Sequence, residues 1–381
     1  MLDFVGTHRQ EFRYDRRYRA LIGGTRRSIE RAVQQGFPFL PAGCYMQLDE
    51  KASEIVMRSL REAIPTSWRA RVEELRVVHA ACPDVTLSKY LEESGLDLPD
   101  VYDGKRGWSD LCEAAEVPIA PAGVHEKPLR KALARLLHID DDERIATYRR
   151  LLKSSSAPDI SAMPERERRL VRMLTAGLGY QVLTKEHTQQ HGVDLVWAHP
   201  QVRAEFAQLL IELDDRVDHL HGKLNRHHDV PLQVHARYTR IEILAAFGIG
   251  DGAAVPPWRE GVYDAKGAHA DLLAFTLDKS SGAFSPTTRY RDYAISPGRI
   301  HWESQSITRA DSDTGLRYRN HERAGRSIML FARMRADDRA FWFLGPATYR
   351  GHVGEKPMAI TWELDTPLSG DLYQSFAATV A

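Results

Sequence analysis

Aromatic, basic and polar side chains are concentrated in "FSPTTRYRDYAISPGRIHWESQS", residues 284–306, which has few aliphatic residues to bury. A segment of this kind is either an unusually polar part of a β domain or a surface that holds something flat and anionic. Tyr and Trp rings stack on unpaired bases and wall pockets for a base turned out of a duplex. The same rings also pack well in a protein core, so the residue types leave both roles open.

Arginine is the second signal in this part of the chain. Residues 284–335 hold ten arginines, no lysine and five acids, whereas the whole chain balances 52 basic against 52 acidic residues. Arginine pairs with phosphate through a planar fork of donors, and a local excess of positive charge is typical of nucleic-acid contacts. A solvated, salt-bridged surface is the alternative. The segment "DSDTGLRYRNHERAGRS", residues 311–327, is expected to be a long loop between strands.

Motifs for catalysis are incomplete. "LIGGTRRS" has neither the spacing nor the lysine of a phosphate-binding loop. "HGKLNRHHD", residues 221–229, resembles the His-x-Lys motif of phospholipase-D-type nucleases, but Lys223 and Asp229 are too far apart and there is one copy. After Asp194, the first acid in a Glu-x-Lys position is Glu205, and the lysine that such restriction nucleases use is missing. We therefore expect no catalytic residue.

Metal binding is also not predicted. His219 and His221 fall on a predicted helix, where residues two apart face different directions, so the histidines and aspartates of 214–228 are expected to be a solvated helix end. The three cysteines are far apart and form no zinc motif. We expect no metal and no cofactor, and a reduced, cytoplasmic, nucleoid-associated protein. No stretch approaches the roughly 18 continuous apolar residues of a membrane span, so no membrane partner is expected.

The hydrophobic pattern changes along the chain. Residues 1–155 are expected to form a helical domain, and residues 156–235 a helical connector whose helix over 201–224 includes the histidines. Residues 236–381 carry seven short β-rich runs and are expected to form a mostly antiparallel β-barrel domain. The predicted fold class is α+β: an N-terminal all-helical region followed by a C-terminal, mostly antiparallel β-barrel.

Local signals fix some of these elements closely. Thr239 and Glu242 have the spacing of a capping box at the start of a helix. Thr86 or Ser88 caps "TLSKYLEESGL", and Gly95 closes it. In "MAITWEL", alternate residues from Met358 would share one face of a strand.

The chain resembles a family through several uncommon strings in one order. "YTRIEILAAFG", "KSSGAFSPTTRYRDYAIS", "HWESQS" and "FLGPATYRGHVGEKPMAITWEL" are similar to the C-terminal domain of large bacterial proteins that also carry a phospholipase-D-type nuclease and a RecA-type helicase motor. Some of these proteins are methylation-dependent (type IV) restriction enzymes. "LDFVGTHRQEFRYDRRYRALIGG", "QGFPFLPAGCYMQLD" and "LLHIDD" are similar to the helical region after their helicase core. The resemblance covers essentially the whole chain and leaves out the nuclease and helicase parts.

The resemblance implies a target-recognition region that binds double-stranded DNA containing 5-methylcytosine. It also implies an SRA-like barrel that flips the base, without nuclease or helicase activity. In such a pocket the aromatic residues would stack on the base, and Asp292 would accept hydrogen bonds from the cytosine amine. The base-pocket candidates are Tyr290, Asp292, Tyr293, Trp302, Ser304, Gln305 and Ser306. The DNA-backbone candidates are Thr287, Thr288, Arg289, Arg291, Arg299, Arg317, Arg319, Arg323 and Arg326.

An interaction module is the alternative function. In that role the helical region 1–230 would dock on a separate helicase or nuclease partner and deliver it to methylated DNA. A third alternative is an enzyme whose active site the motifs do not reveal. The sequence leaves open the oligomeric state and the bases that flank the modified one.

Overall fold

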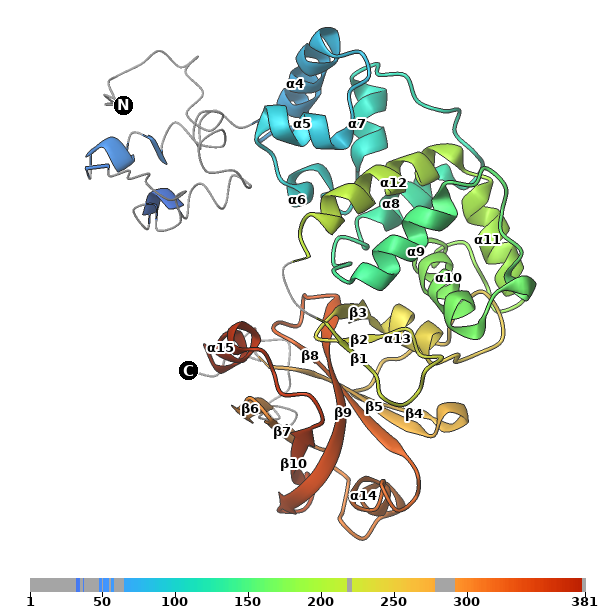
Figure 1. The fold of residues 1–381 in the computed structure, drawn as a ribbon, viewed down its shortest axis with the longest axis vertical. Helices are drawn as coiled ribbons and strands as arrows, with labels where there is room; N and C mark the ends of the chain where they lie inside the picture. The colour runs from blue at the N-terminus through green and yellow to red at the C-terminus, as the bar shows by residue number, and fades with distance from the viewer. Residues whose placement is uncertain are drawn as a thin grey trace. The chain divides into compact units, whose positions relative to one another are not determined.

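A computed structural model of the chain describes residues 32–34, 37, 48–49, 51–54, 56–57, 65–217, 221–277 and 292–378 (Figure 1). The chain divides into two compact units. Unit 1 comprises residues 1–137 with 204–212, and unit 2 comprises residues 138–203 with 213–381. These boundaries differ from those expected near 155 and 235, because residues 138–152 are tied to the β-rich part by buried ion pairs.

Unit 1 is helical in its described residues. Its helices are α4 (Trp68–Ala81), α5 (Leu87–Ser94), α6 (Leu98–Val101), α7 (Trp108–Ala114) and α8 (Glu126–Leu133). The predicted ends of α5 are confirmed, since the Thr86 hydroxyl accepts a first-turn N–H at 3.2 Å and Gly95 has a left-handed φ of 71°. Glu205, which comes from a later helix, is fully buried and accepts the backbone N–H groups of Trp108 and Ser109 at the start of α7.

Unit 2 places helices around a sheet. Its helical segments are α9 (Asp142–Leu152), η1 (Ile160–Ala162), α10 (Glu165–Leu178), α11 (Gln189–Trp197), α13 (Arg240–Ala246), η2 (Lys266–Ala268), α14 (Asp313–Arg319) and α15 (Gly370–Ala378). A further helix, α12 (Pro200–Asp214), has residues in both units. The helix predicted over 201–224 is wrong at its end, because Gly222–Lys223 form a strand. The loop predicted over 311–327 is also wrong, because it contains α14, whose start is capped by Ser312.

Eight strands of unit 2 form one mixed sheet. They are β3 (Arg237–Thr239), β4 (Val262–Ala265), β5 (Ala270–Thr276), β6 (Tyr293–Ser296), β7 (Arg299–Glu303), β8 (Ser327–Arg333), β9 (Ala340–Val353) and β10 (Ala359–Leu364). The order is β4-β5-β8-β9-β10-β7-β6, with β3 paired to β9, and only β5 and β8 run parallel. A separate pair joins β1 (Gly222–Lys223) to β2 (Gln233–Val234).

The predicted α+β class is confirmed. The predicted barrel is not, because the described strands form an open sheet. All seven predicted β-rich runs contain a strand. The two ends of the order, β4 and β6, do not pair with each other among the described strands, so the sheet is open rather than closed. A local pattern of alternating residues predicts strands well, whereas closure depends on how the first and last strands meet.

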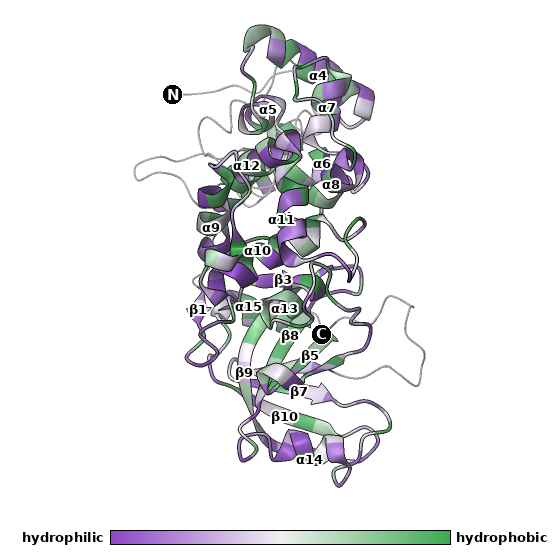
Figure 2. Cartoon of the chain, turned by 90° about the vertical axis from the view of Figure 1, so that its right-hand side faces the viewer, coloured by the Kyte–Doolittle hydropathy of each residue, from purple (hydrophilic) through white to green (hydrophobic). Residues whose placement is uncertain are grey.

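The core of unit 2 lies against this sheet. All seven residues of β5 are buried, and Figure 2 shows hydrophobic colouring along β5 and β8. The predicted buried face of β10 is confirmed, since Met358, Ile360 and Trp362 are fully buried and Leu364 is 5% exposed. In the described ranges, no helix has the length and apolar character needed to cross a membrane.

A buried network of charges joins α9 to α13. The Arg144 guanidinium, which has no exposed surface, donates from Nη1 to Glu242 Oε1 at 2.9 Å and is paired with Asp141. His138 Nε2 lies 2.6 Å from Glu242 Oε2. Burial alone would raise the pKa of Glu242, but His138 and Arg144 outweigh it and hold this pKa at about 2. The predicted capping box of Thr239 and Glu242 is confirmed, so one carboxylate both caps α13 and anchors α9.

Candidate nucleic-acid interface

The predicted base-pocket residues lie on both faces of β7. Alternate residues of a strand point to opposite faces. Trp302 is 3% exposed and belongs to the core, with its ring 5.7 Å from the ring of Tyr318. Tyr293 pairs with His301 across β6 and β7, and their rings stack at 4.6 Å. Because His301 and Trp302 are adjacent on the strand, Tyr293 and Trp302 are on opposite faces and do not wall one pocket.

The polar base-pocket candidates near β7 accept hydrogen bonds from main-chain N–H groups of the protein. The Asp292 carboxylate is buried and accepts the backbone N–H of Glu303 at 2.9 Å. The Ser304 hydroxyl is also buried and accepts the N–H of Met358 at 2.9 Å. Both groups therefore help to hold β6, β7 and β10 together.

The remaining base-pocket candidates lie in a turn or outside the described residues. Gln305 Oε1 accepts a hydrogen bond from the Thr308 hydroxyl at 3.3 Å, and Ser306 is exposed. Thr287, Thr288, Arg289, Tyr290 and Arg291 are outside the described residues. The base contacts of Tyr290, Gln305 and Ser306 stay predictions, as do the DNA-backbone contacts of Thr287, Thr288, Arg289 and Arg291.

Two of the arginines that were predicted to contact the DNA backbone form ion pairs inside unit 2 instead. Arg317 Nε donates to Asp271 Oδ1 at 3.0 Å, and Arg326 Nε donates to the other oxygen of Asp271 at 3.2 Å. Arg326 also pairs with Asp264 at 2.6 Å. Burial raises the pKa of Asp271 against the attraction of both arginines. Arg317 and Arg326 are thus committed to this carboxylate pair on β4 and β5.

The ion pairs change the charge count of 284–335. The described part of that segment has eight arginines, and these now face seven carboxylates: five in the segment and two from β4 and β5. The local excess of positive charge is therefore smaller than the sequence window suggests, because a window along the chain does not include partners from other strands.

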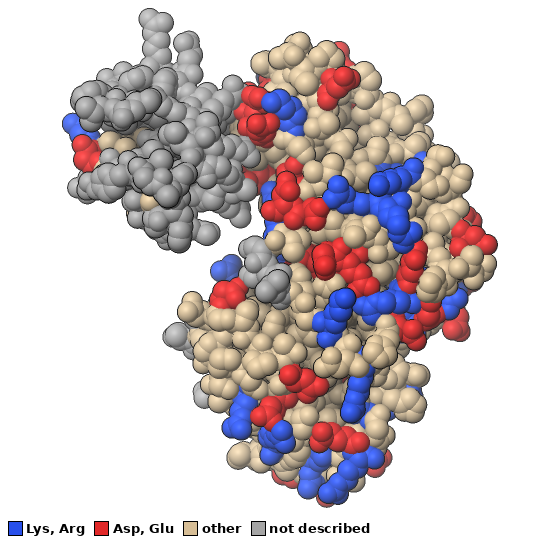
Figure 3. Space-filling view, in the orientation of Figure 1, with Lys and Arg blue, Asp and Glu red and all other residues tan. Residues whose placement is uncertain are grey.

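Exposed arginines remain available for phosphate. Arg299, Arg319 and Arg323 are exposed, and one nitrogen of Arg319 donates to the carbonyl oxygen of Ala310 at 3.1 Å. In Figure 3, basic side chains gather at the lower end of the view, where Figure 1 places α14, with acidic side chains among them. Arg319 and Arg323 lie on α14 and on the turn that follows it.

The described residues of unit 2 form a cavity of about 510 Å³ next to this turn. Three stretches line it: the loop after β1, the turn from α14 into β8, and β9 with the residues after β10. Its lining residues are Lys223, Leu224, Asn225, Arg226, His227, Val234, His321, Glu322, Gly325, Arg326, Ser327, Ile328, Pro346, Ala347, Thr348, Asp365 and Thr366. Arg326 alone among them was a predicted site residue.

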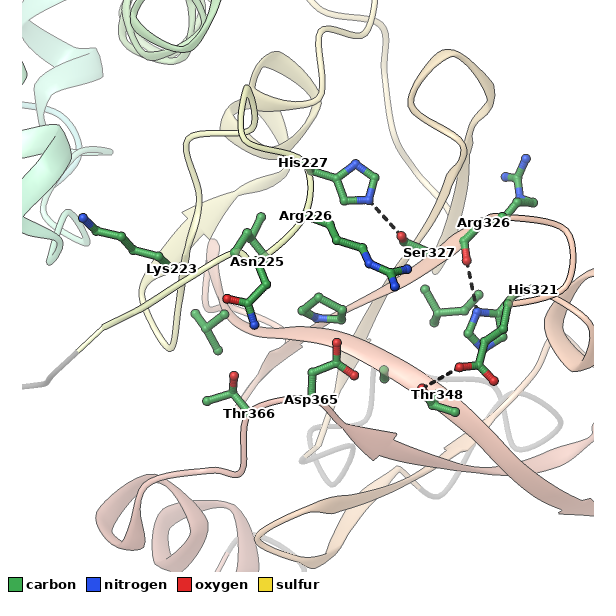
Figure 4. A pocket seen from close by; sticks show the side chains of 17 residues that line it. Lys223, Asn225, Arg226, His227, His321, Arg326, Ser327, Thr348, Asp365 and Thr366 are labelled. Atoms are coloured by element: carbon green, nitrogen blue, oxygen red, sulfur yellow. Dashed lines mark hydrogen bonds between the residues drawn. The ribbon is translucent and has the colours of Figure 1, made fainter.

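Three unpaired polar side chains converge in the cavity. Figure 4 shows Asn225 and Arg226 extending from the loop after β1 toward Asp365, which follows β10. None of these three side chains has a hydrogen-bond partner among the described residues. Burial raises the pKa of the Asp365 carboxyl, and the Arg226 guanidinium opposes that rise. The cavity therefore offers donors on one side and a carboxylate acceptor on the other.

His321 fixes one wall of the cavity. Its Nε2 accepts the backbone N–H of Tyr349 at 3.2 Å, so Nδ1 carries the proton and donates to the carbonyl oxygen of Arg326 at 3.2 Å. Burial lowers the pKa of His321, which favours this neutral form. The ring therefore clamps the turn after α14 onto β9.

His227 and Ser327 form a second polar pair in the cavity. His227 Nε2 lies 2.8 Å from the Ser327 hydroxyl, and His227 has a left-handed φ of 62°. Burial, followed by the charges of Arg226 and Arg169, lowers the pKa of His227. A nucleophile–base pair of the hydrolase type also needs a third group that orients the base, and no described residue hydrogen-bonds His227 Nδ1.

Sequence reasoning missed this cavity because its lining comes from segments far apart in the chain. The stretch 221–229 could have indicated the cavity, but its residues were considered only as a nuclease motif and as a metal site. Within the described ranges, no group of three or more metal-ligating side chains is found. Three of the stretch's residues, Asn225, Arg226 and His227, instead present polar groups to the cavity.

Comparison with protein families matches the C-terminal part of the chain. No curated protein matches the chain. Residues 232–376 match the family described as "Domain of unknown function (DUF3427)". The matched range starts just before β2 and contains the whole eight-stranded sheet, together with the cavity walls formed by the turn after α14, by β9 and by the residues after β10.

Proposed function

We propose that this chain binds double-stranded DNA, recognises 5-methylcytosine in it, and neither cuts nor unwinds the DNA itself. The observation that carries the proposal is the cavity of about 510 Å³ with its unpaired Asn225, Arg226 and Asp365. This volume is within the range of about 300–1,000 Å³ that small-ligand sites occupy. The cavity replaces the β6–β7 region as the base site, because Trp302 and Ser304 are used in the core.

The polar groups of the cavity complement a cytosine edge. Carboxylates accept hydrogen bonds from the exocyclic amine of cytosine, which is the role for Asp365. Asn225 and Arg226 carry donors for the ring nitrogen and the carbonyl oxygen of the base. Val234, Ile328 and Pro346 line the same cavity and give an apolar wall for the methyl group.

Exposed arginines next to the cavity would hold the DNA backbone. Arg323 belongs to the turn that forms one wall, and Arg319 precedes it on α14. Contacts to phosphate fix the register of a protein on DNA, whereas contacts to the base select the sequence. The proposal thus separates Arg319 and Arg323 from the three residues that read the base.

The resemblance to methylation-dependent restriction proteins supports the same function. We also propose that the fold is SRA-like, which the α+β class supports. In this chain the sheet of that fold would be open rather than closed into a barrel. Flipping a base costs a few kcal/mol, so the hydrogen bonds of the cavity would have to offset that cost.

A binding titration tests the proposal directly. Matched methylated and unmethylated duplexes are titrated with the full chain at one salt concentration. Burial of one methyl group contributes about 0.8 kcal/mol, so the methylated duplex should bind at least about fourfold more tightly. Equal affinity for the two duplexes would rule the proposal out.

Two matched variants locate the base. Asp365→Asn should weaken binding of the methylated duplex by about tenfold, since a good base-edge contact is worth about 1–3 kcal/mol. Asp337→Asn removes an exposed carboxylate outside the cavity and should leave affinity unchanged. If both variants behave like the unaltered chain, the base does not bind in this cavity.

A further inference from the structure

A second cavity of unit 2, about 450 Å³ in volume, is lined by arginines. Arg168, Arg169 and Arg172 of α10 form one wall. The rest of the lining comes from η1, from the start of α11 and from the loop after α13. No residue proposed to contact DNA lines it. Its chemistry therefore calls for a separate explanation.

Arg172 is a buried cation without a carboxylate partner in the part of the chain that the structure describes. It is 2% exposed, and its Nε and Nη2 donate to the carbonyl oxygens of Gly252 at 3.1 Å and Ile249 at 2.8 Å. No described carboxylate forms an ion pair with it, and burial lowers its pKa against the weaker attraction of Asp251. Buried charges are normally paired with an opposite charge, so this site lacks a counter-anion.

The one carboxylate of α10 that lines the cavity, Glu165, is already shared. Arg169 Nε donates to Glu165 Oε1 at 2.6 Å, and Arg168 pairs with the other oxygen of Glu165. One carboxylate thus serves two guanidinium groups while Arg172 has none. Asp251, the other acid of the lining, is exposed at the rim. The cavity carries three cations against two anions.

The opposite wall also favours an anion. Thr188, Gln189 and Gln190, which start the nine-residue helix α11, line the cavity. The Thr188 hydroxyl accepts the N–H of His191 at 3.2 Å, and the N–H groups of Gln189 and Gln190 have no partner inside the helix. The positive end of a helix dipole stabilises negative charge. Gly250, with φ of 78°, brings the loop close to Arg172.

We infer that this cavity binds a phosphate group, supplied either by a nucleic-acid backbone or by a small phosphate ester. Arginine forks and helix N-termini are the two protein groups that suit phosphate oxygens best. The phosphate would provide the missing counter-charge for Arg172 and would contact Arg168 at the rim. This site is independent of the proposed base cavity.

Titration of the full chain with inorganic phosphate tests the inference. Calorimetry at constant ionic strength, with chloride as the reference anion, should show saturable binding. Arg168→Gln is the informative variant because its side chain is 40% exposed and its loss leaves the buried contacts of Arg172 in place. The affinity for phosphate should fall about tenfold, the loss expected for one charge-assisted hydrogen bond.

Arg150→Gln is the matched control. Arg150 is an exposed arginine of α9 that pairs with Glu167 and does not line the cavity, so its variant should bind phosphate normally. Absence of saturable binding, or equal affinities in the Arg168 and Arg150 variants, would overturn the inference.

The source of the phosphate follows from a second measurement. If a DNA backbone supplies it, Arg168→Gln should reduce the salt dependence of duplex binding by about one unit of slope, since one phosphate contact is lost. An unchanged slope, together with weakened binding of inorganic phosphate, assigns the site to a small phosphate ester. Unmethylated duplex is used, so the result does not depend on recognition of methylcytosine.

Discussion

Individual charged residues of this chain fall into two groups according to their partners. Arg144, Arg317 and Arg326 are each paired with carboxylates from other elements and stabilise the fold. Arg172 and Arg226 have no such pairing in the described residues, and each lines a cavity. Since the residue type is the same in all five cases, only the structure separates a stabilising arginine from a candidate ligand contact.

Glu242 gives a prediction about pH. Its pKa is held at about 2 in the folded chain, against an ordinary value of 4.5. A depressed carboxyl pKa stabilises the fold above the ordinary value, and this stabilisation is lost as the pH falls from about 4.5 toward 2. The shift corresponds to roughly 3 kcal/mol in the free energy of unfolding. Glu242→Gln should therefore lower stability at neutral pH and flatten the loss of stability in acid.

Urea unfolding measured between pH 2 and pH 7 checks this expectation. Glu363→Gln is the control, because Glu363 is a half-exposed carboxylate that pairs with the exposed Arg350, and its loss should leave the pH dependence as it is. If Glu242→Gln and the unaltered chain lose stability in parallel on acidification, the buried network does not depend on this carboxylate.

At the level of elements, α14 shows what a local pattern misses. Seven of the eight strands of the sheet were predicted, because short β-rich runs separated by turn residues mark them directly, whereas the three-residue strand β3 was not. The seven-residue helix α14 was not, since it lies in an arginine-rich stretch and its one fully buried large side chain, Tyr318, gives no apolar period. The candidate cavity could not be predicted from local sequence either, because the residues that line it are more than a hundred positions apart in the chain.

Gly315 within α14 gives a prediction about this element. A Cβ atom at this position would lie 1.9 Å from the carbonyl oxygen of Arg309, a backbone atom that cannot turn aside. Gly315→Ala should therefore displace α14, which carries Tyr318 into the core, and should cost about 1–3 kcal/mol or more of stability. Gly267→Ala has open space for the added atom and should be nearly neutral. Thermal unfolding of the two variants decides the point, and equal midpoints would contradict it.

For the whole molecule, the domain boundary predicted from composition differs from the division into two units that the structure gives. The domain boundary near residue 155 was predicted from a polar stretch that contains Ser and Pro. The structural division instead assigns residues 138–203 to the same unit as the sheet, and residues 204–212 to the N-terminal unit. Composition detects where the chain is polar, whereas the units are set by buried contacts between distant segments.

Cutting the chain at residue 155 therefore should not yield two folded parts. A fragment 1–155 lacks Glu205 and Gln208, which accept backbone N–H groups of Trp108, Ser109 and Leu87 inside unit 1. A fragment 156–381 lacks His138 and Arg144, which leaves the buried carboxylate of Glu242 unpaired. Loss of one partner of a buried ion pair costs about 3–5 kcal/mol, a large part of the stability of a domain.

Calorimetric unfolding of the two fragments checks this expectation, and neither should show a cooperative transition. The control is the full chain cleaved after Ser155 at an engineered protease site, which breaks the same bond but keeps every segment present. Because the buried contacts of both units remain, the cleaved chain should unfold cooperatively, close to the temperature of the intact chain. A cooperative transition in the isolated 156–381 fragment would show that the sheet folds without α9, and would place the boundary where composition suggested.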